Sequence, residues 1–203
     1  MSTLLAALAG YLVGSLPTAG ALARLRGIDL RAEGSGNPGA NNALRTGGPV
    51  LAGTVLAVEA AKGYLAVWLG GTIADDTGAV AAGIAAVAGN VFNVWYRFRG
   101  GKGLGISLGV LAGAWPLAIP PVLVVMVATV LITRSAGLAA LAAIATLLAL
   151  SLIWPTTGWP TGGVEPGPGL TALAAGMAAT MAWKHWRDSP LNPEWRLRTP
   201  ESG

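Results

Sequence analysis

Long apolar stretches without charge alternate along this chain with short polar segments. The charge-free stretches are 1–23, 77–96, 104–133, 135–164 and 166–183. A helix needs about 20 apolar residues to cross the hydrocarbon layer of a bilayer. The pattern therefore predicts an all-α integral membrane protein. Single spans are predicted at 1–23, 50–72, 78–96, 137–154 and 169–184.

The stretch 104–133 is too long for one span and has prolines in its middle. These are Pro116, Pro120 and Pro121. Proline interrupts a helix because it lacks the N–H group and its ring clashes with the preceding turn. We therefore predict two short helices in this stretch, either as two spans or as one re-entrant hairpin. The total becomes about seven transmembrane helices.

Basic residues mark alternate connections between the predicted spans. Apart from Lys62, the lysines and arginines fall into four groups, which are Arg24, Arg26, Arg31 and Arg45; Arg97, Arg99 and Lys102; Arg134; and Lys184, Arg187, Arg196 and Arg198. The other connections contain Asp75, Asp76 and Glu165 and no basic residue. Basic loops stay in the cytoplasm. We therefore expect the N-terminus outside the cell and the C-terminus in the cytoplasm.

Composition narrows the class of protein further. Charged residues make up only 11% of the 203 residues and hydrophobic residues make up 53%, which argues against both a soluble domain and a disordered chain. There is no cysteine and one histidine, so disulfides, thiol catalysis and histidine-rich metal sites are excluded. We predict one transmembrane domain, 1–187, followed by a cytoplasmic tail, 188–203, with no metal and no cofactor.

The first cytoplasmic connection is rich in hydrogen-bond donors. Residues 33–45 read EGSGNPGANNALR, and this density of glycine, asparagine and proline predicts a non-helical loop. Glycines let a ligand approach the backbone, and successive N–H groups can bind an anion. Arg45 adds a guanidinium group suited to phosphate. The alternative is an ordinary polar loop with glycines at its turns.

The second cytoplasmic connection, RFRGGKG at 97–103, is basic and glycine-rich and leads into the next predicted helix. A helix N-terminus beside Lys102 is a suitable anion site. The alternative is a basic anchor on the cytoplasmic face. Two such loops on one face predict a substrate, or two substrates, carrying phosphate at the cytoplasmic surface.

Three further ionisable residues have more than one interpretation. Glu59 and Lys62 share a helical face inside the span 50–72. They either support the loops or contact substrate, or they form a structural ion pair, which is the interpretation we favour. His185 could act as an acid or base near neutral pH. It could equally be an interfacial residue beside Trp183 and Trp186.

Both loops resemble known motifs. Residues 34–42 with Arg45 resemble the first motif of the bacterial acyl-phosphate:glycerol-3-phosphate acyltransferases, and residues 98–103 resemble the second. The resemblance implies a seven-helix bundle in the bacterial inner (plasma) membrane with its active site on the cytoplasmic face. It also implies transfer of an acyl chain from acyl phosphate to the first hydroxyl of glycerol 3-phosphate. The products would be lysophosphatidic acid, a phospholipid precursor, and phosphate.

The resemblance also implies roles for particular residues. The catalytic candidates are His185, Lys102 and Arg45. The substrate-binding candidates are Ser35, Gly36, Asn37, Gly39, Asn41, Asn42, Arg45, Gly100, Gly101 and Lys102. The expected partners are acyl phosphate, glycerol 3-phosphate and the lipid bilayer, with no nucleic acid.

This chain departs from the family's pattern at several positions, which are Glu59, Asn90, Asn93, Gly137 and Asp188. Two alternatives therefore stay open. One is a divergent relative that is inactive or acts on another substrate. The other is a small membrane transporter or lipid-binding protein.

Overall fold

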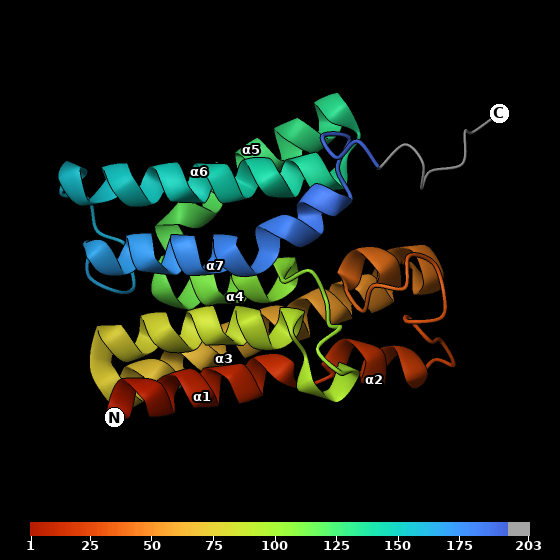
Figure 1. Cartoon of the computed structure of the whole chain (residues 1–203), viewed down its shortest axis with the longest axis horizontal. Coiled ribbons are helices and arrows are strands. Elements are labelled where there is room, and N and C mark those ends of the chain that lie inside the picture. Colours follow the sequence, from red (N-terminus) through yellow and green to blue (C-terminus); the bar gives the residue numbers. More distant parts are fainter. Residues whose placement is uncertain (195–203) are drawn as a thin grey trace.

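The computed structural model describes residues 1–194, and its regular structure is helical (Figure 1). The α-helices are α1 (Ser2–Ser15), α2 (Thr18–Arg24), α3 (Ala40–Val91), α4 (Leu104–Ala114), α5 (Ile119–Thr133), α6 (Ala136–Thr157) and α7 (Pro168–Arg187). Two 3₁₀ turns, η1 (Val94–Tyr96) and η2 (Pro116–Ala118), lie between them. Arg196 and Arg198 of the predicted tail lie outside the described residues.

The first predicted span is helical but broken. Its two parts, α1 and α2, are separated by Leu16 and Pro17, and Leu16 is extended with φ −54° and ψ 126°. The ring of a proline pushes the residue before it out of the helical region. The break leaves the carbonyl group of Leu16 without a helical partner, and this group instead accepts a hydrogen bond from Lys62 of α3.

The long helix α3 consists of three helical pieces. Gly48, with φ 80°, separates the first two turns from the rest, and Ala74 and Asp75 are non-helical where the chain turns back (Figure 1). The glycines Gly70 and Gly78 meet across this turn. The two predicted spans 50–72 and 78–96 are therefore the two antiparallel limbs of α3. The second limb ends at Val91, five residues earlier than predicted.

The stretch 104–133 forms two short helices, as the prolines predict. Helix α4 ends at Ala114, and α5 begins at Ile119 with prolines in its first turn. The two are not a paired hairpin, because α4 packs mainly against α3 and α5 packs mainly against α6. Helix α4 has 11 residues and is about 16 Å long, which is shorter than the roughly 30 Å hydrocarbon layer.

Within residues 1–194, four helical segments are long and apolar enough to cross a membrane. They are Ser2–Arg24, Ala40–Tyr96, Pro116–Thr133 and Ala136–Thr157. The fold is thus a helical membrane fold, while the count of seven spans stays a prediction.

Glycines allow the helices to approach closely. Gly10 and Gly14 of α1 lie against the backbone of α3, where an added Cβ would come within 2.2 Å of carbonyl oxygens. Gly109 of α4 lies in the same way against Ala60. Small residues at helix contacts are typical of membrane bundles, where packing rather than the hydrophobic effect drives association.

The connections with basic residues all lie at one end of the bundle. The end of α2, the α3–α4 connection, the α5–α6 turn and the end of α7 are at the right in Figure 1. The N-terminus, the bend of α3 and the α6–α7 connection lie at the opposite end. There the backbone N–H of Glu165 donates to Asp76 at 2.7 Å. The bundle is therefore polarised by charge from end to end.

Candidate functional site

The first loop is held in shape by Asn42, whose side chain is 1% exposed. Its amide nitrogen donates to the carbonyl oxygens of Leu30, at 2.9 Å, and Glu33, at 3.0 Å. Its amide oxygen accepts the backbone N–H of Ser35 at 2.8 Å. Gly34 has φ 59°, and a Cβ there would lie 2.2 Å from the same amide oxygen, so only glycine fits. Asn42 therefore positions the loop.

The loop is shorter than predicted, because helix α3 begins inside it at Ala40. Asn41, Asn42 and Arg45 lie on this helix, which corrects our prediction of a non-helical segment through Arg45. Gly39 precedes the helix with extended backbone, φ −152°. No side chain caps this helix end in the described structure. The first N–H groups of the helix are therefore available to a ligand.

The second loop is fixed at Gly100 and Gly101. The N–H of Gly100 donates to the carbonyl of Val91 at 3.1 Å, and that of Gly101 donates to the carbonyl of Asn90 at 3.0 Å. Lys184 of α7 donates to three carbonyls, those of Val91 (3.1 Å), Gly100 (2.9 Å) and Gly101 (2.8 Å). The N–H groups of both glycines therefore hold the loop in this structure and do not face a ligand.

Lys102 and His185 meet where α7 ends. Lys102 forms an ion pair with Asp188, and both side chains are partly exposed. Nε2 of His185 lies 3.2 Å from the carbonyl oxygen of Lys102. Burial of the ring, aided by the nearby Lys102 cation, lowers the pKa of His185 to about 4. His185 lies beyond the predicted span 169–184 and is buried within the protein.

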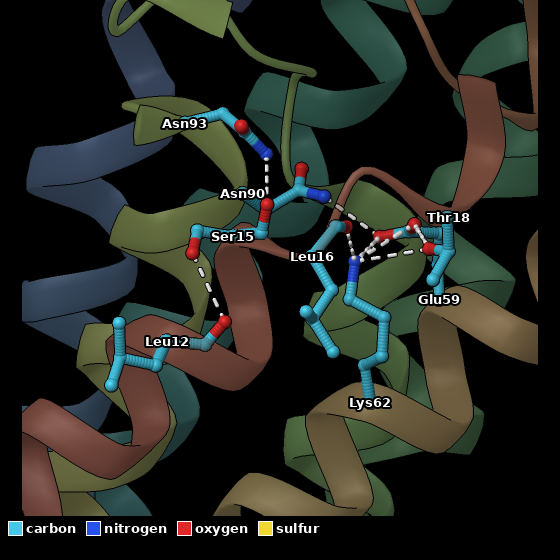
Figure 2. Close-up of polar contacts among 8 residues, drawn as sticks. All are labelled: Leu12, Ser15, Leu16, Thr18, Glu59, Lys62, Asn90 and Asn93. Carbon is cyan, nitrogen blue, oxygen red and sulfur yellow. Dashed lines mark hydrogen bonds and ion pairs between the residues drawn. The ribbon is translucent and has the colours of Figure 1, made fainter. Parts of the chain in front are cut away.

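A buried polar cluster lies beneath the loops. Figure 2 shows Nζ of Lys62 among oxygen atoms of Glu59, Thr18 and Leu16. Lys62 lies 3.0 Å from Glu59 and donates at 2.8 Å to the carbonyl freed by the break at Pro17. Glu59 also accepts from Thr18 at 2.7 Å. The two residues thus form the expected ion pair, while its role stays a prediction.

Two asparagines connect this cluster to the second loop. Asn90 donates to Glu59 at 2.7 Å, and Asn93 donates to the carbonyl of Ser15 at 2.6 Å (Figure 2). A Cβ added at Gly101 would lie 2.9 Å from the amide oxygen of Asn90. The sequence shows both asparagines as polar residues in the charge-free stretch 77–96. Their polarity within an apolar stretch could have identified Asn90 and Asn93 as candidate site residues. The comparison with the family's motifs shows only that they differ from the usual residues at these positions.

The structure brings the two loops together. Arg31 donates to the carbonyl of Arg99 at 3.1 Å. A Cβ at Gly101 would lie 3.5 Å from the carbonyl oxygen of Pro38. Pro38 and Gly101 also line a small cavity that reaches down to Glu59. The N-terminal end of α3 and the loop before α4 are therefore neighbours.

The other predicted site residues lie on the loop surface. Ser35, Gly36, Asn41 and Arg45 are exposed, and Asn37 is half-buried. The guanidinium group of Arg45 makes no ion pair within the described part of the chain. The site therefore offers free hydroxyl, amide, guanidinium and helix N–H donors, together with one lysine whose counter-ion is an exposed carboxylate.

Comparisons with known sequences agree on one family. The family model described as glycerol-3-phosphate acyltransferase matches residues 4–190. A glycerol-3-phosphate acyltransferase of Agrobacterium fabrum is 39% identical over 186 residues, covering 91% of this chain and 85% of the relative. One of Aromatoleum aromaticum is 42% identical over 187 residues, covering 91% of this chain and 90% of the relative.

Comparisons with solved structures give the same result. Two crystal structures of PlsY (YgiH), an integral membrane glycerol 3-phosphate acyltransferase, cover 100% of this chain and 96% of theirs. The glycerol 3-phosphate form has a TM-score of 0.77 at 26% identity. The lysophosphatidic acid form has a TM-score of 0.78 at 25% identity.

Proposed function

Because this chain belongs to the glycerol-3-phosphate acyltransferase family, we propose that it transfers an acyl chain from acyl phosphate to glycerol 3-phosphate. The products are lysophosphatidic acid and inorganic phosphate. The observation that carries the proposal is the meeting of the two loops at the basic end of the bundle. There the uncapped start of α3 lies beside the loop that holds Lys102.

Two anionic substrates must meet in this site. Arg45 and Lys102 offset the repulsion between their phosphate groups, and the first N–H groups of α3 add a further positive potential. Ser35, Asn37 and Asn41 supply neutral donors. Lys102 reaches a substrate phosphate by exchanging its ion pair with Asp188, whose carboxylate is partly exposed. Gly100 and Gly101 set the backbone that carries Lys102.

The reaction needs little covalent chemistry from the protein. The hydroxyl oxygen of glycerol 3-phosphate attacks the carbonyl carbon of acyl phosphate, and the bond from that carbon to the phosphate oxygen breaks. The departing phosphate takes the hydroxyl proton. Alignment of two bound reactants can supply about 7–11 kcal/mol of barrier reduction. His185, neutral and bound to the backbone of Lys102, positions the lysine.

We also propose the membrane arrangement of this chain. Seven segments enter the bilayer: α1 with α2, the two limbs of α3, and each of α4, α5, α6 and α7. The N-terminus lies outside and the basic end, with the active site, faces the cytoplasm of a bacterial inner membrane. The end-to-end separation of basic from acidic connections supports this arrangement.

A direct assay tests the proposed function. The purified protein in uncharged detergent is incubated with palmitoyl phosphate and glycerol 3-phosphate, and both products are quantified. We expect lysophosphatidic acid and phosphate in equal amounts. Product formation from palmitoyl coenzyme A but not from palmitoyl phosphate would contradict the proposed donor, and absence of product from either would favour an inactive relative.

A further inference from the structure

A second cavity, of about 380 Å³, opens at the basic end of the bundle. Its lining residues are Pro17, Arg24, Arg31, Trp95, Tyr96 and Arg97. Half of these residues are arginines. Ser35, Arg45 and Lys102, which we assign to the substrates, do not line it. The cavity adjoins the small cavity above Glu59, with which it shares Pro17 and Tyr96, and it meets the second loop at Arg97, but none of the residues that we assign to the substrates lines it.

The three arginines come from different parts of the chain. Arg24 lies in the last turn of α2, and Arg97 follows η1. Neither they nor Arg31 forms an ion pair within residues 1–194. Arg31 is held in place, because it donates to the carbonyl of Arg99 at 3.1 Å and its guanidinium lies 4.6 Å from the ring centre of Tyr96. Converging cations without counter-ions favour an anionic ligand.

The backbone at Arg97 is also unusual. Arg97 and the following Phe98 have φ 51° and φ 62°, in the left-handed region that is unfavourable for residues with a Cβ. Such conformations persist where the surrounding structure enforces them, and they concentrate at binding sites. The conformation of Arg97 thus agrees with a binding role for this segment.

The aromatic lining distinguishes a lipid from a small soluble anion. Trp95 lines the cavity and is 64% exposed. Val94, Phe98 and Leu25, which adjoin the lining residues in sequence, are exposed large apolar residues. Tryptophan and arginine occur together at the depth of the lipid headgroups, where one part of a ligand is apolar and the other charged. An amphiphile satisfies both kinds of side chain, whereas free phosphate satisfies only the arginines.

We propose that this cavity binds the phosphate-containing headgroup of an anionic phospholipid from the surrounding bilayer. The arginines contact the phosphate oxygens, and the acyl chains lie along the exposed apolar side chains next to Trp95. The proposal goes beyond the acyl transfer, because this lipid is neither substrate nor product at the two loops.

Lipid binding in detergent tests the proposal without relying on catalysis. Binding of dioleoyl phosphatidylglycerol is titrated by native mass spectrometry for the wild type and for two single variants, Arg24→Gln and Arg97→Asn. Asparagine is chosen at 97 because it tolerates left-handed backbone. Each variant loses a charge-assisted contact, so we expect the apparent Kd to rise about tenfold or more. The matched control is Arg26→Gln, which removes an equal charge from an exposed residue outside the cavity.

Each outcome decides the proposal. It is supported if Arg26→Gln and Arg45→Ala bind like the wild type while both cavity variants bind weakly. It is overturned if Arg26→Gln weakens binding as much as the two cavity variants do, because the loss of affinity then follows from the lower net charge and not from the cavity. Loss of lipid in Arg45→Ala overturns it by placing the cavity in the substrate site. Equal binding of dioleoyl phosphatidylcholine, or displacement of the lipid by inorganic phosphate, overturns the assignment to an anionic lipid.

Discussion

His185 is 2% exposed, and its Nε2 faces the carbonyl oxygen of Lys102. Because a carbonyl oxygen only accepts hydrogen bonds, Nε2 carries a proton. Burial, aided by the nearby Lys102 cation, lowers the pKa of His185 from its usual 6.5 to about 4. We therefore propose that its role is to hold the backbone that carries Lys102.

The variant His185→Gln separates positioning from proton transfer. A glutamine amide can donate to the same carbonyl but cannot take up a proton, so we expect turnover within about tenfold of the wild type. His185→Phe, which cannot donate, should be slower than His185→Gln. General base catalysis predicts a loss of about 10²- to 10⁴-fold in both variants. Initial rates at pH 7.5 distinguish the two roles.

The same residue predicts how stability depends on pH. Its folded pKa, about 4, lies below the ordinary value, so protonation favours unfolding. The contribution of neutral His185 to the free energy of unfolding is fully present above about pH 6.5. It is lost as the pH falls toward 4, by roughly 1.4 kcal/mol per pH unit. The melting temperature of the wild type should therefore fall more steeply than that of His185→Gln over this range. Parallel curves would contradict the depressed pKa.

The residue types in the sequence predicted which hydrogen-bond donors lie near the site. They did not predict which of these side chains face the interior of the protein and which face solvent. Asn41 and Asn42 are identical neighbours, yet Asn42 is buried in the loop and Asn41 is exposed. Which of them faces inward depends on where helix α3 begins. The glycines, asparagines and proline of this segment disfavour a helix locally, so the start at Ala40 could not be predicted from propensity.

At the scale of elements, α7 holds the second loop through Lys184, in addition to the contact of His185 with Lys102. Lys184 donates to the carbonyls of Val91, Gly100 and Gly101 and thereby joins the ends of α7 and α3 to this loop. Hydrogen bonds from a charged group contribute about 1.5–3 kcal/mol each.

Replacing Lys184 with methionine tests this link. Methionine keeps much of the length and apolar stem but donates no hydrogen bond. We expect faster amide hydrogen exchange across residues 100–103 and a KM for acyl phosphate raised about tenfold. Arg187→Met, one turn away, is the control and should leave both unchanged. Unaltered exchange in Lys184→Met would show that the loop is held by its own backbone bonds.

The prolines in the stretch 104–133 predicted the break between its two helices. Pro116, Pro120 and Pro121 lie where α4 gives way to α5. The break at Pro17 was not predicted, because the first span carries no charge at that point and its apolar pattern is continuous. The structural role of this break depends on a distant residue, since the freed carbonyl of Leu16 binds Lys62, 46 residues away.

At the scale of the whole molecule, the alternation of basic and acidic connections predicts which connections face the cytoplasm. A reporter fusion can test this orientation. A reporter that is active only in the cytoplasm should give a signal when fused after Gly203 and none when inserted within 156–166. The positive-inside rule supplies the reason. Signal at both positions, or only at the second, would contradict the proposed orientation.

The gathering of the loops at one end was predictable from charge, but their contact was not. Charge patterning places residues 33–45 and 97–103 on the same face. Their meeting at Pro38 and Gly101 depends on how closely α1 and α4 pack against α3 through glycines. Such packing is specified by shape, which leaves no periodic signal in the sequence.

The central claim is that these two loops bind the phosphates of the reacting substrates. The most direct test is the rate of phosphate release from palmitoyl phosphate and glycerol 3-phosphate by Arg45→Ala and Lys102→Ala, with Arg134→Ala as control at the same end of the bundle. Loss of a charge-assisted contact should reduce kcat/KM by about 10- to 150-fold in the first two, at unchanged melting temperature, and leave the control unaffected. Rates equal to the wild type in Arg45→Ala and Lys102→Ala would contradict the account.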